Sequence, residues 1–280
     1  MPRIERQVVI ALTVALIVAL EGCGDTRSTA APAANTTPST TSVPVERLRV
    51  KVLASFPHDT TAFTEGLVFD SRDDLYESTG EYGRSTIRRV EPTTGAVLSS
   101  VALEPDEFGE GIAMGTGRSL VQLTWKERRS IDWNLDTLER GRTVSYEGEG
   151  WGLTSDADNA RFVMSNGSST LTFRDINSFA VLGTVQVELD GVPLSELNEL
   201  EEVGEVVWAN VWQTDEIVRI DPVTGHVTAV VDASGLLDAT RSEAADVLNG
   251  VAHRPGDPDD VLWITGKRWP TMFQVQLVPA

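Results

Sequence analysis

Five positions of the sequence share one short pattern and carry residue types that can do chemistry. The pattern is a polar or aromatic residue, then glycine or glutamate, then an aliphatic residue. Its first positions, spaced 45, 41, 47 and 51 residues apart, are Glu65, Glu110, Trp151, Asn198 and Asn249. If these positions served only to pack the hydrophobic core, all five would hold aliphatic side chains. Two acids, two amides and an indole therefore indicate a functional site where the repeats meet.

The two acids at equivalent positions, Glu65 and Glu110, are candidates for proton transfer. Like charges on adjacent repeats disturb each other's ionisation, and such a pair can serve as general acid and base. Lys267, in the turn 266–270, would pair with one carboxylate or stabilise developing negative charge. The alternatives are that the acids bind exposed backbone amides and that the lysine is solvated.

Repeats of this length, each holding several short strands, must supply the elements that position these side chains. The spacing predicts an all-β fold, a five-bladed β-propeller with four antiparallel strands per blade. In the first repeat we expect strands at 66–70, 75–79, 85–90 and 96–103. The last repeat has only three, at 250–253, 261–265 and 272–277. The alternating strand at 47–54 would complete that blade, and segment 234–247 could form a helical turn.

Strand direction selects one face of this array. The first strand of a blade begins at the repeated position and the second runs back, so both ends lie at the same mouth. Trp125, Trp212 and Lys267 follow second strands and join the site on this basis. An aromatic-walled opening with a few polar groups is the expected form of a binding site. The alternative for the tryptophans is packing between blades, which we assign to Trp133, Trp208 and Trp263 because they fall inside strands.

The first 45 residues have a different character from the rest. Arginines precede an apolar stretch at 8–20, and Cys23, the single cysteine, follows it. Residues 1–23 thus resemble a bacterial lipoprotein signal with Cys23 as the lipidated residue, and a plain secretory peptide is the alternative. Residues 24–45 read as a flexible tether and 46–280 as the folded domain. We expect an exported protein, lipid-anchored on the outer face of the bacterial cytoplasmic membrane or, as the alternative, secreted in soluble form.

Composition excludes several classes of function. The net charge of −19 argues against nucleic-acid binding, because nothing would neutralise phosphates. The three histidines are scattered and no metal-binding motif is present, so we expect no metal and no cofactor. Nothing demands a partner subunit, so a monomer is expected, with membrane contact only through the lipid anchor.

Motifs across 46–280 resemble the glutaminyl cyclases of plants and bacteria, the glutamine cyclotransferase family. The matching stretches are 56–59, 62–67, 77–83, 108–111, 151–153, 197–201, 208–215, 247–250 and 265–270. The resemblance implies a metal-independent enzyme that cyclises N-terminal glutamine of peptides and proteins to pyroglutamate and releases ammonia.

The resemblance also implies roles for individual residues. The acid–base glutamate of the family falls on Glu110, the active-site lysine on Lys267 and the amide-binding asparagine on Asn198. The pocket aromatics of the family fall on Phe63, Phe108, Trp125, Trp151 and Trp212. Glu65 would bind the amine or the departing ammonia, and Asn249 joins the site by position without an assigned role. The rival hypotheses are a lipid-tethered propeller that only binds peptide N-termini, and a propeller hydrolase or lactonase.

Overall fold

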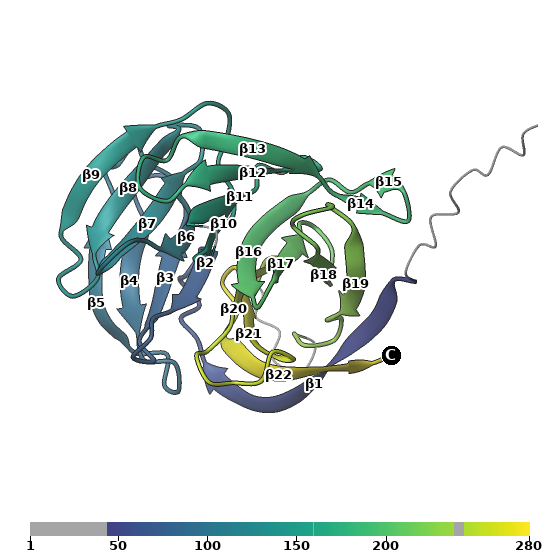
Figure 1. Ribbon diagram of the computed structural model, residues 1–280. Helices are drawn as coiled ribbons and strands as arrows, with labels where there is room; N and C mark the ends of the chain where they lie inside the picture. Colours follow the sequence, from purple (N-terminus) through teal and green to yellow (C-terminus); the bar gives the residue numbers. More distant parts are fainter. Residues whose placement is uncertain (1–43, 159, 238–243) are drawn as a thin grey trace, which may run out of the picture. The chain divides into compact units, whose positions relative to one another are not determined.

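β-Strands account for all the regular secondary structure that the computed structural model describes, in residues 44–158, 160–237 and 244–280 (Figure 1). Three four-stranded antiparallel sheets each follow chain order. Their strands are β2 (Thr64–Phe69), β3 (Leu75–Thr79), β4 (Thr86–Val90), β5 (Val97–Ala102); β6 (Gly109–Met114), β7 (Ser119–Thr124), β8 (Arg129–Asn134), β9 (Arg140–Ser145); and β10 (Leu153–Asp156), β11 (Arg161–Met164), β12 (Thr170–Asp175), β13 (Val181–Gln186). The four strands expected in the first repeat are confirmed.

The remaining long strands form one eight-stranded sheet that contains two four-stranded antiparallel runs. The first run is β16 (Leu197–Val203), β17 (Val206–Val211), β18 (Glu216–Ile220) and β19 (Val227–Asp232). The second is β20 (Leu248–Ala252), β21 (Val261–Gly266), β22 (Thr271–Pro279) and, from the N-terminal side of the domain, β1 (Glu46–Pro57).

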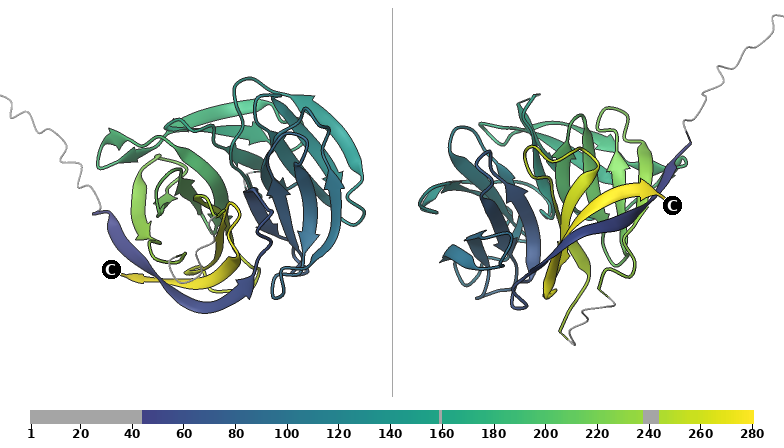
Figure 2. Two further views of the ribbon diagram at one scale, coloured as in Figure 1. Left: turned by 180° about the vertical axis from the view of Figure 1, so that it is seen from behind. Right: turned by 90° about the horizontal axis from the view of Figure 1, so that it is seen from below.

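Strand β1 joins the two ends of the folded chain, as the sequence predicted. It pairs antiparallel with β22 from Leu48 opposite Pro279 to Pro57 opposite Thr271. Both views of Figure 2 show purple β1 beside yellow β22. A second pairing, parallel to β19 at residues 46–49, merges the two runs into one sheet and was not expected. The N-terminal strand thereby covers two sheet edges that would otherwise be open to pairing with another chain.

The first strands of the five runs meet side by side. Contacts follow the cyclic order β2, β6, β10, β16, β20 and back to β2, and these strands lie at the centre of Figure 1. The glycine of the repeated pattern permits this approach. A Cβ on Gly111 would lie 2.5 Å from the backbone nitrogen of Leu153, and one on Gly66 would lie 2.7 Å from that of Ile112. The repeat is therefore a packing requirement of neighbouring inner strands.

Hydrophobic cores fill the spaces between neighbouring sheets. One cluster joins Tyr76 of β3 to Trp133 of β8, and another joins Phe69 of β2 to Trp263 of β21. The tryptophans assigned to packing, Trp133, Trp208 and Trp263, are all buried in such clusters. Each face of a strand run is thus covered by its neighbour, which fixes the inner strands that carry the repeated positions.

The structure departs from the expectation in a short hairpin, β14 (Glu188–Leu189) and β15 (Val192–Pro193), which was missed. In segment 234–247 the described residues, 234–237 and 244–247, form turns and irregular backbone and no helix. The signal at 1–23, with Cys23, and the tether up to residue 43 lie outside the described residues. Within the described part of the chain, no helix is both long and apolar enough to span a membrane.

Candidate active site

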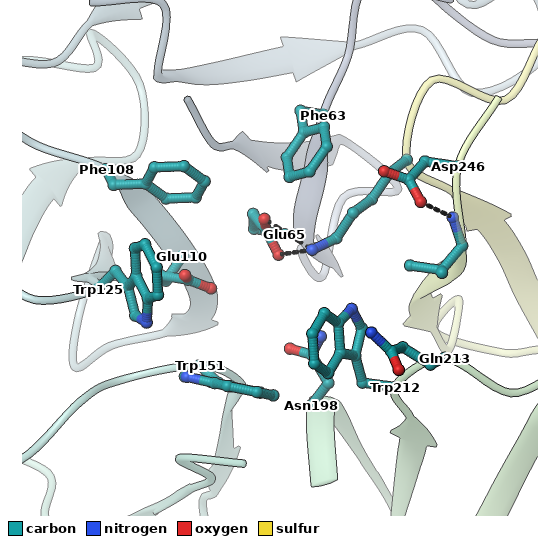
Figure 3. Close-up of a pocket in the computed structure, with 12 residues that line it drawn as sticks. Phe63, Glu65, Phe108, Glu110, Trp125, Trp151, Asn198, Trp212, Gln213 and Asp246 are labelled. Carbon is teal, nitrogen blue, oxygen red and sulfur yellow. Dashed lines mark hydrogen bonds and ion pairs between the residues drawn. The ribbon is translucent and has the colours of Figure 1, made fainter. Parts of the chain in front are cut away.

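A cavity of about 290 Å³ opens at the mouth that the strand directions predicted (Figure 3). The lining residues are Phe63, Glu65, Phe108, Glu110, Trp125, Trp151, Asn198, Trp212, Gln213, Asp246, Val247 and Lys267. All residues predicted for the cavity are among them except Asn249. Cys23, predicted as the lipidation site, lies outside the described residues. The cavity is large enough for a small amino-acid side chain with its amine.

Two sets of strand ends position the polar side chains. Glu65 and Glu110 lie near the start of β2 and β6, and Asn198 near the start of β16. Lys267 directly follows β21, which runs back antiparallel beside β20. Each of these inner strands also has a register irregularity at the repeated position, for example between Gly109 and Ile112. Such irregularities re-aim side chains and are common beside active sites.

Glu65 is held in a buried ion pair. The Nζ of Lys267 lies 2.8 Å from each oxygen of the Glu65 carboxylate. The side-chain amide of Asn249 donates to Glu65 Oε2 at 3.3 Å and to the carbonyl oxygen of Thr64 at 2.9 Å. Asn249 is fully buried behind Glu65 and outside the cavity lining. Asn249, which joined the site by position without an assigned role, therefore contacts Glu65 and helps to position it.

Glu110 occupies the equivalent place on the next inner strand but has no such partner. Its residue is 5% exposed, and its carboxylate makes no hydrogen bond or ion pair to any residue that the structure describes. Figure 3 shows the Glu110 carboxylate directed into the cavity between Trp125 and Glu65. A buried carboxyl without a partner is costly unless its proton affinity rises or a ligand pairs with it.

The pKa values of the two acids follow from these surroundings. Burial raises the pKa of Glu65 to about 7, with the charge of Lys267 opposing the rise. Burial also raises the pKa of Glu110 well above its ordinary value, and the like charge of Glu65 raises it further. Glu149 and Glu127 add to the rise, whereas Lys267 opposes it. The raised pKa and the cavity position of Glu110 together make it the candidate for proton exchange.

Aromatic rings form the wall around Glu110. Phe108 packs edge-on against Trp125 at a centroid distance of 5.5 Å and against Phe63 at 6.2 Å. Trp151 packs edge-on against Trp212 at 5.5 Å. Apolar walls exclude water, which strengthens electrostatic interactions inside the cavity.

Asn198 presents an amide at the far wall. Its residue is 3% exposed, and its side-chain oxygen is buried without a hydrogen-bond partner among the described residues. Leaving such a group unpaired costs about 1–3 kcal/mol, so it calls for an explanation at a candidate functional site. A ligand carboxamide is a chemically matched partner for this wall.

A buried network supports the turn that carries Lys267. The ring nitrogens of His58 contact the carbonyl oxygen of Trp269 at 2.7 Å and the Glu77 carboxylate at 3.0 Å. Both partners are acceptors, so both nitrogens donate and the ring is an imidazolium. Burial alone lowers the pKa of His58, but the charge and hydrogen bond of Glu77 outweigh it and raise the pKa. Arg88 completes the network through a 2.7 Å contact to Glu77.

Sequence reasoning did not assign Gln213, Asp246 and Val247 to the cavity, nor Glu149 to its wall. A positional signal was available. Residues two places before the repeated positions are Phe63, Phe108, Glu149, Glu196 and Val247, and three of these five line the cavity. Gln213 follows Trp212 at the end of a second strand, where the geometry already pointed.

No group of three or more histidine, cysteine, aspartate or glutamate side chains able to hold a metal is found in the described residues. The cavity itself holds two glutamates, one of them paired with lysine, and one aspartate. The fold and the site thus define an all-β protein with an aromatic-walled cavity that contains two buried glutamates and a lysine.

Comparison with known proteins places this chain in a family. The family model for glutamine cyclotransferase matches residues 25–277, so the chain belongs to that family. It is 38% identical over 237 residues to a glutaminyl-peptide cyclotransferase of Arabidopsis thaliana, covering 82% of this chain and 72% of that protein. It is also similar to the crystal structure of Myxococcus xanthus glutaminyl cyclase, with a TM-score of 0.77 and 38% identity over 85% of this chain and 100% of that one.

Proposed function

We propose that this protein is a glutaminyl-peptide cyclotransferase that converts N-terminal glutamine of peptides and proteins to pyroglutamate and ammonia. The observation that carries the proposal is the pair Glu65 and Glu110. One carboxylate is neutralised by Lys267, while the other is buried, unpaired and directed into an aromatic cavity. The family of the chain and the names of its two relatives agree with this activity.

Cyclisation requires a proton to move from one nitrogen to another. The α-amine has a reference pKa of about 7.7–8.0, and it attacks the γ-carbonyl carbon only as the free amine. As the new carbon–nitrogen bond forms, the attacking nitrogen loses a proton to the Glu110 carboxylate. The protonated Glu110 then donates to the γ-amide nitrogen, the old carbon–nitrogen bond breaks and ammonia leaves. Glu110 returns to the carboxylate, so one residue serves as base and then as acid.

The neighbouring polar groups bind the two reacting groups of the glutamine residue, which are its γ-amide and its α-amine. In the proposed reaction Asn198 hydrogen-bonds the γ-amide; the support is its side-chain oxygen, which has no hydrogen-bond partner among the described residues. The Glu65 carboxylate, which Lys267 and Asn249 hold in position, binds the amine or the departing ammonia in this proposal. Lys267 also offsets negative charge in the cavity, and its positive charge stabilises the oxyanion that forms on the γ-carbonyl oxygen.

The aromatic walls contribute proximity. An extended glutamine chain must fold back so that its amine reaches its own γ-carbon, and a narrow apolar cavity favours the folded conformer. Trp125, Trp151 and Trp212 line the cavity and would contact the folded glutamine side chain. The proposed reaction uses no metal, in keeping with the two-carboxylate chemistry described above.

The proposed scaffold is a five-bladed β-propeller. Three separate sheets and the two runs of the eight-stranded sheet supply five sets of four strands, with β1 as the last strand of the fifth set. The cyclic contacts of the inner strands support this arrangement. A radial array brings residues distant in sequence, such as Glu65 and Lys267, to one mouth.

An ammonia-release assay tests the proposal. The purified protein should release one ammonia per peptide from a substrate beginning with glutamine and none from the same peptide with an acetylated amine, because the amine is the nucleophile. Activity should persist after exhaustive chelation and should not rise on adding zinc. Binding of the peptide without ammonia release would instead support a non-enzymatic propeller that captures N-termini.

A further inference from the structure

One carboxylate holds two tryptophans of the cavity wall. Glu149 Oε2 accepts the indole N–H of Trp125 at 2.8 Å and that of Trp151 at 3.3 Å. Trp125 follows β7 of one sheet, and Trp151 precedes β10 of the next. The single oxygen therefore links the walls contributed by two neighbouring sheets.

The position that Glu149 occupies in the repeat carries different residue types in different repeats. It stands two residues before Trp151, as Phe63 and Phe108 stand two residues before Glu65 and Glu110. In those two repeats the position supplies an aromatic ring to the cavity, whereas in the third repeat its carboxylate binds the indoles of two lining tryptophans.

The loop around Glu149 is shaped by the glycines on either side of it. Gly148 has a φ of +85°, and a Cβ on Gly150 would overlap the hydroxyl of Tyr146. Gly148 thus favours glycine because of its backbone conformation, and Gly150 because of its close contact with the Tyr146 side chain. The loop between β9 and β10 is therefore held in a conformation that places Glu149 beside the two indoles.

The hydrogen bonds to Glu149 decide what the two rings present to a substrate. In Figure 3 the nitrogen ends of Trp125 and Trp151 lie close together, on the side away from Glu65. With both N–H groups turned to Glu149, the carbon surfaces of the rings face the cavity. We propose that Glu149 is a positioning residue that fixes both indoles around the bound glutamine and tunes proton transfer at Glu110; this inference rests on the proposed function.

The charge of Glu149 also reaches Glu110. The ionisable groups whose charges act on or face Glu110 are Glu65 on β2, Lys267 after β21, Glu127 after β7, Glu149 before β10, and the phenols Tyr82 and Tyr146. Of these, Glu127 is already bound to the backbone N–H of Phe108 and to the hydroxyl of Tyr82. Glu149 carries a negative charge in the cavity wall and raises the pKa of Glu110. Removing that charge therefore stabilises the carboxylate form of Glu110.

Two substitutions separate the hydrogen-bonding role of Glu149 from its charge. Glu149→Gln keeps an oxygen that can accept both indole N–H groups but removes the charge. We expect its KM for a glutamine-initiated peptide to stay within about twofold of wild type, while the acid limb of kcat/KM moves down by about 0.5–1 pH unit. Glu149→Ala also removes the acceptor, and we expect its KM to rise about tenfold, equivalent to about 1.4 kcal/mol. Glu147→Gln, an exposed acid in the same loop, should leave both quantities unchanged.

A measurement on the indoles tests the geometry without any turnover. The chain has seven tryptophans, and their indole N–H signals can be followed by NMR in a labelled protein. Glu149→Ala should move the two signals of Trp125 and Trp151 and leave those of buried Trp133 and Trp263 in place, which also shows that the variant is folded.

The outcomes separate this inference from the proposed function. A wild-type protein that releases no ammonia contradicts the proposed function, and the indole signals then still decide the geometric part. Unmoved indole signals in Glu149→Ala, a KM equal to that of Glu147→Gln, or an unshifted acid limb in Glu149→Gln would each overturn the role of Glu149 in an active enzyme.

Discussion

Glu65 and Glu110 occupy equivalent positions on neighbouring inner strands, yet their carboxylates have different surroundings. Lys267 and Asn249 both bind the carboxylate of Glu65. Glu110 faces an aromatic wall and receives no hydrogen bond from the described residues. Environments that separate two like carboxyls in this way assign one to charge and the other to proton transfer. These different surroundings explain why only Glu110 is proposed as the acid–base catalyst.

Removing the charge of Glu65 should shift the pH profile in a defined direction. Glu110 acts as a base in its ionised form, so activity is present above its pKa and lost as the pH falls through it. Because the like charge of Glu65 raises that pKa, Glu65→Gln should lower it, and Lys267, freed from its ion pair, should lower it further. The acid limb of kcat/KM is the measurement. A limb that stays in place or moves to higher pH would contradict the coupling, and exposed Glu104→Gln serves as the control.

The sequence predicted the strands and the side of the array that holds the site, because local rules determine both. Antiparallel connections alternate direction, so the start of a first strand and the end of a second strand must share a side, which brought Trp125 and Lys267 beside Glu110. The sequence did not decide which of the two acids pairs with Lys267, because this depends on where the lysine side chain extends in three dimensions. The parallel pairing of β1 with β19 and the bridging role of Glu149 were missed for a related reason: each depends on contacts between separate repeats.

One repeat replaces its glycine by Glu199, and the structure shows what this residue does instead. Its carboxylate accepts the backbone N–H of Val251 at 2.7 Å and that of Leu67 at 3.3 Å. These amides belong to β20 and β2, so Glu199 on β16 links three of the inner strands. Burial raises the pKa of Glu199 well above its ordinary value, and the two amides oppose the rise. The side chain therefore closes the contact between the first and last strand runs.

Replacing Glu199 should weaken the fold more than the chemistry. Glu199→Gln keeps one acceptor oxygen but turns an N–H donor toward one of the two backbone amides, leaving a buried donor unpaired. We expect the free energy of unfolding to fall by about 1–3 kcal/mol in chemical denaturation. Glu205→Gln, in the exposed turn after the same strand, should change it by less than about 0.5 kcal/mol. Equal stability of the two variants would contradict the bridging role.

For the whole molecule, we propose export and a lipid anchor at Cys23 on the outer face of the bacterial cytoplasmic membrane. The proposal rests on the basic and apolar start of the chain, on the single cysteine that follows it and on the polar stretch at 24–45. A lipid chain adds about 0.8 kcal/mol of membrane affinity per buried CH₂. The domain itself carries a large excess of acidic residues and would not be attracted to an anionic membrane surface.

Substituting the cysteine tests the anchor. The wild-type protein expressed in bacteria should sediment with membranes and be released by detergent but not by high salt, since the attachment is hydrophobic. Cys23→Ser should appear in the soluble fraction with unchanged turnover of a glutamine peptide. A wild-type protein already soluble after export would contradict the anchor and favour the plain secretory alternative.

The central claim is that Glu110 moves the proton from the attacking amine to the leaving amide. The most direct test compares ammonia release from a glutamine-initiated peptide by wild type and Glu110→Gln, with circular dichroism to confirm that the variant is folded. Since general acid–base transfer contributes about 10²–10⁴ in rate, kcat should fall by at least about a hundredfold while the peptide still binds. A folded Glu110→Gln protein with wild-type kcat would contradict the account.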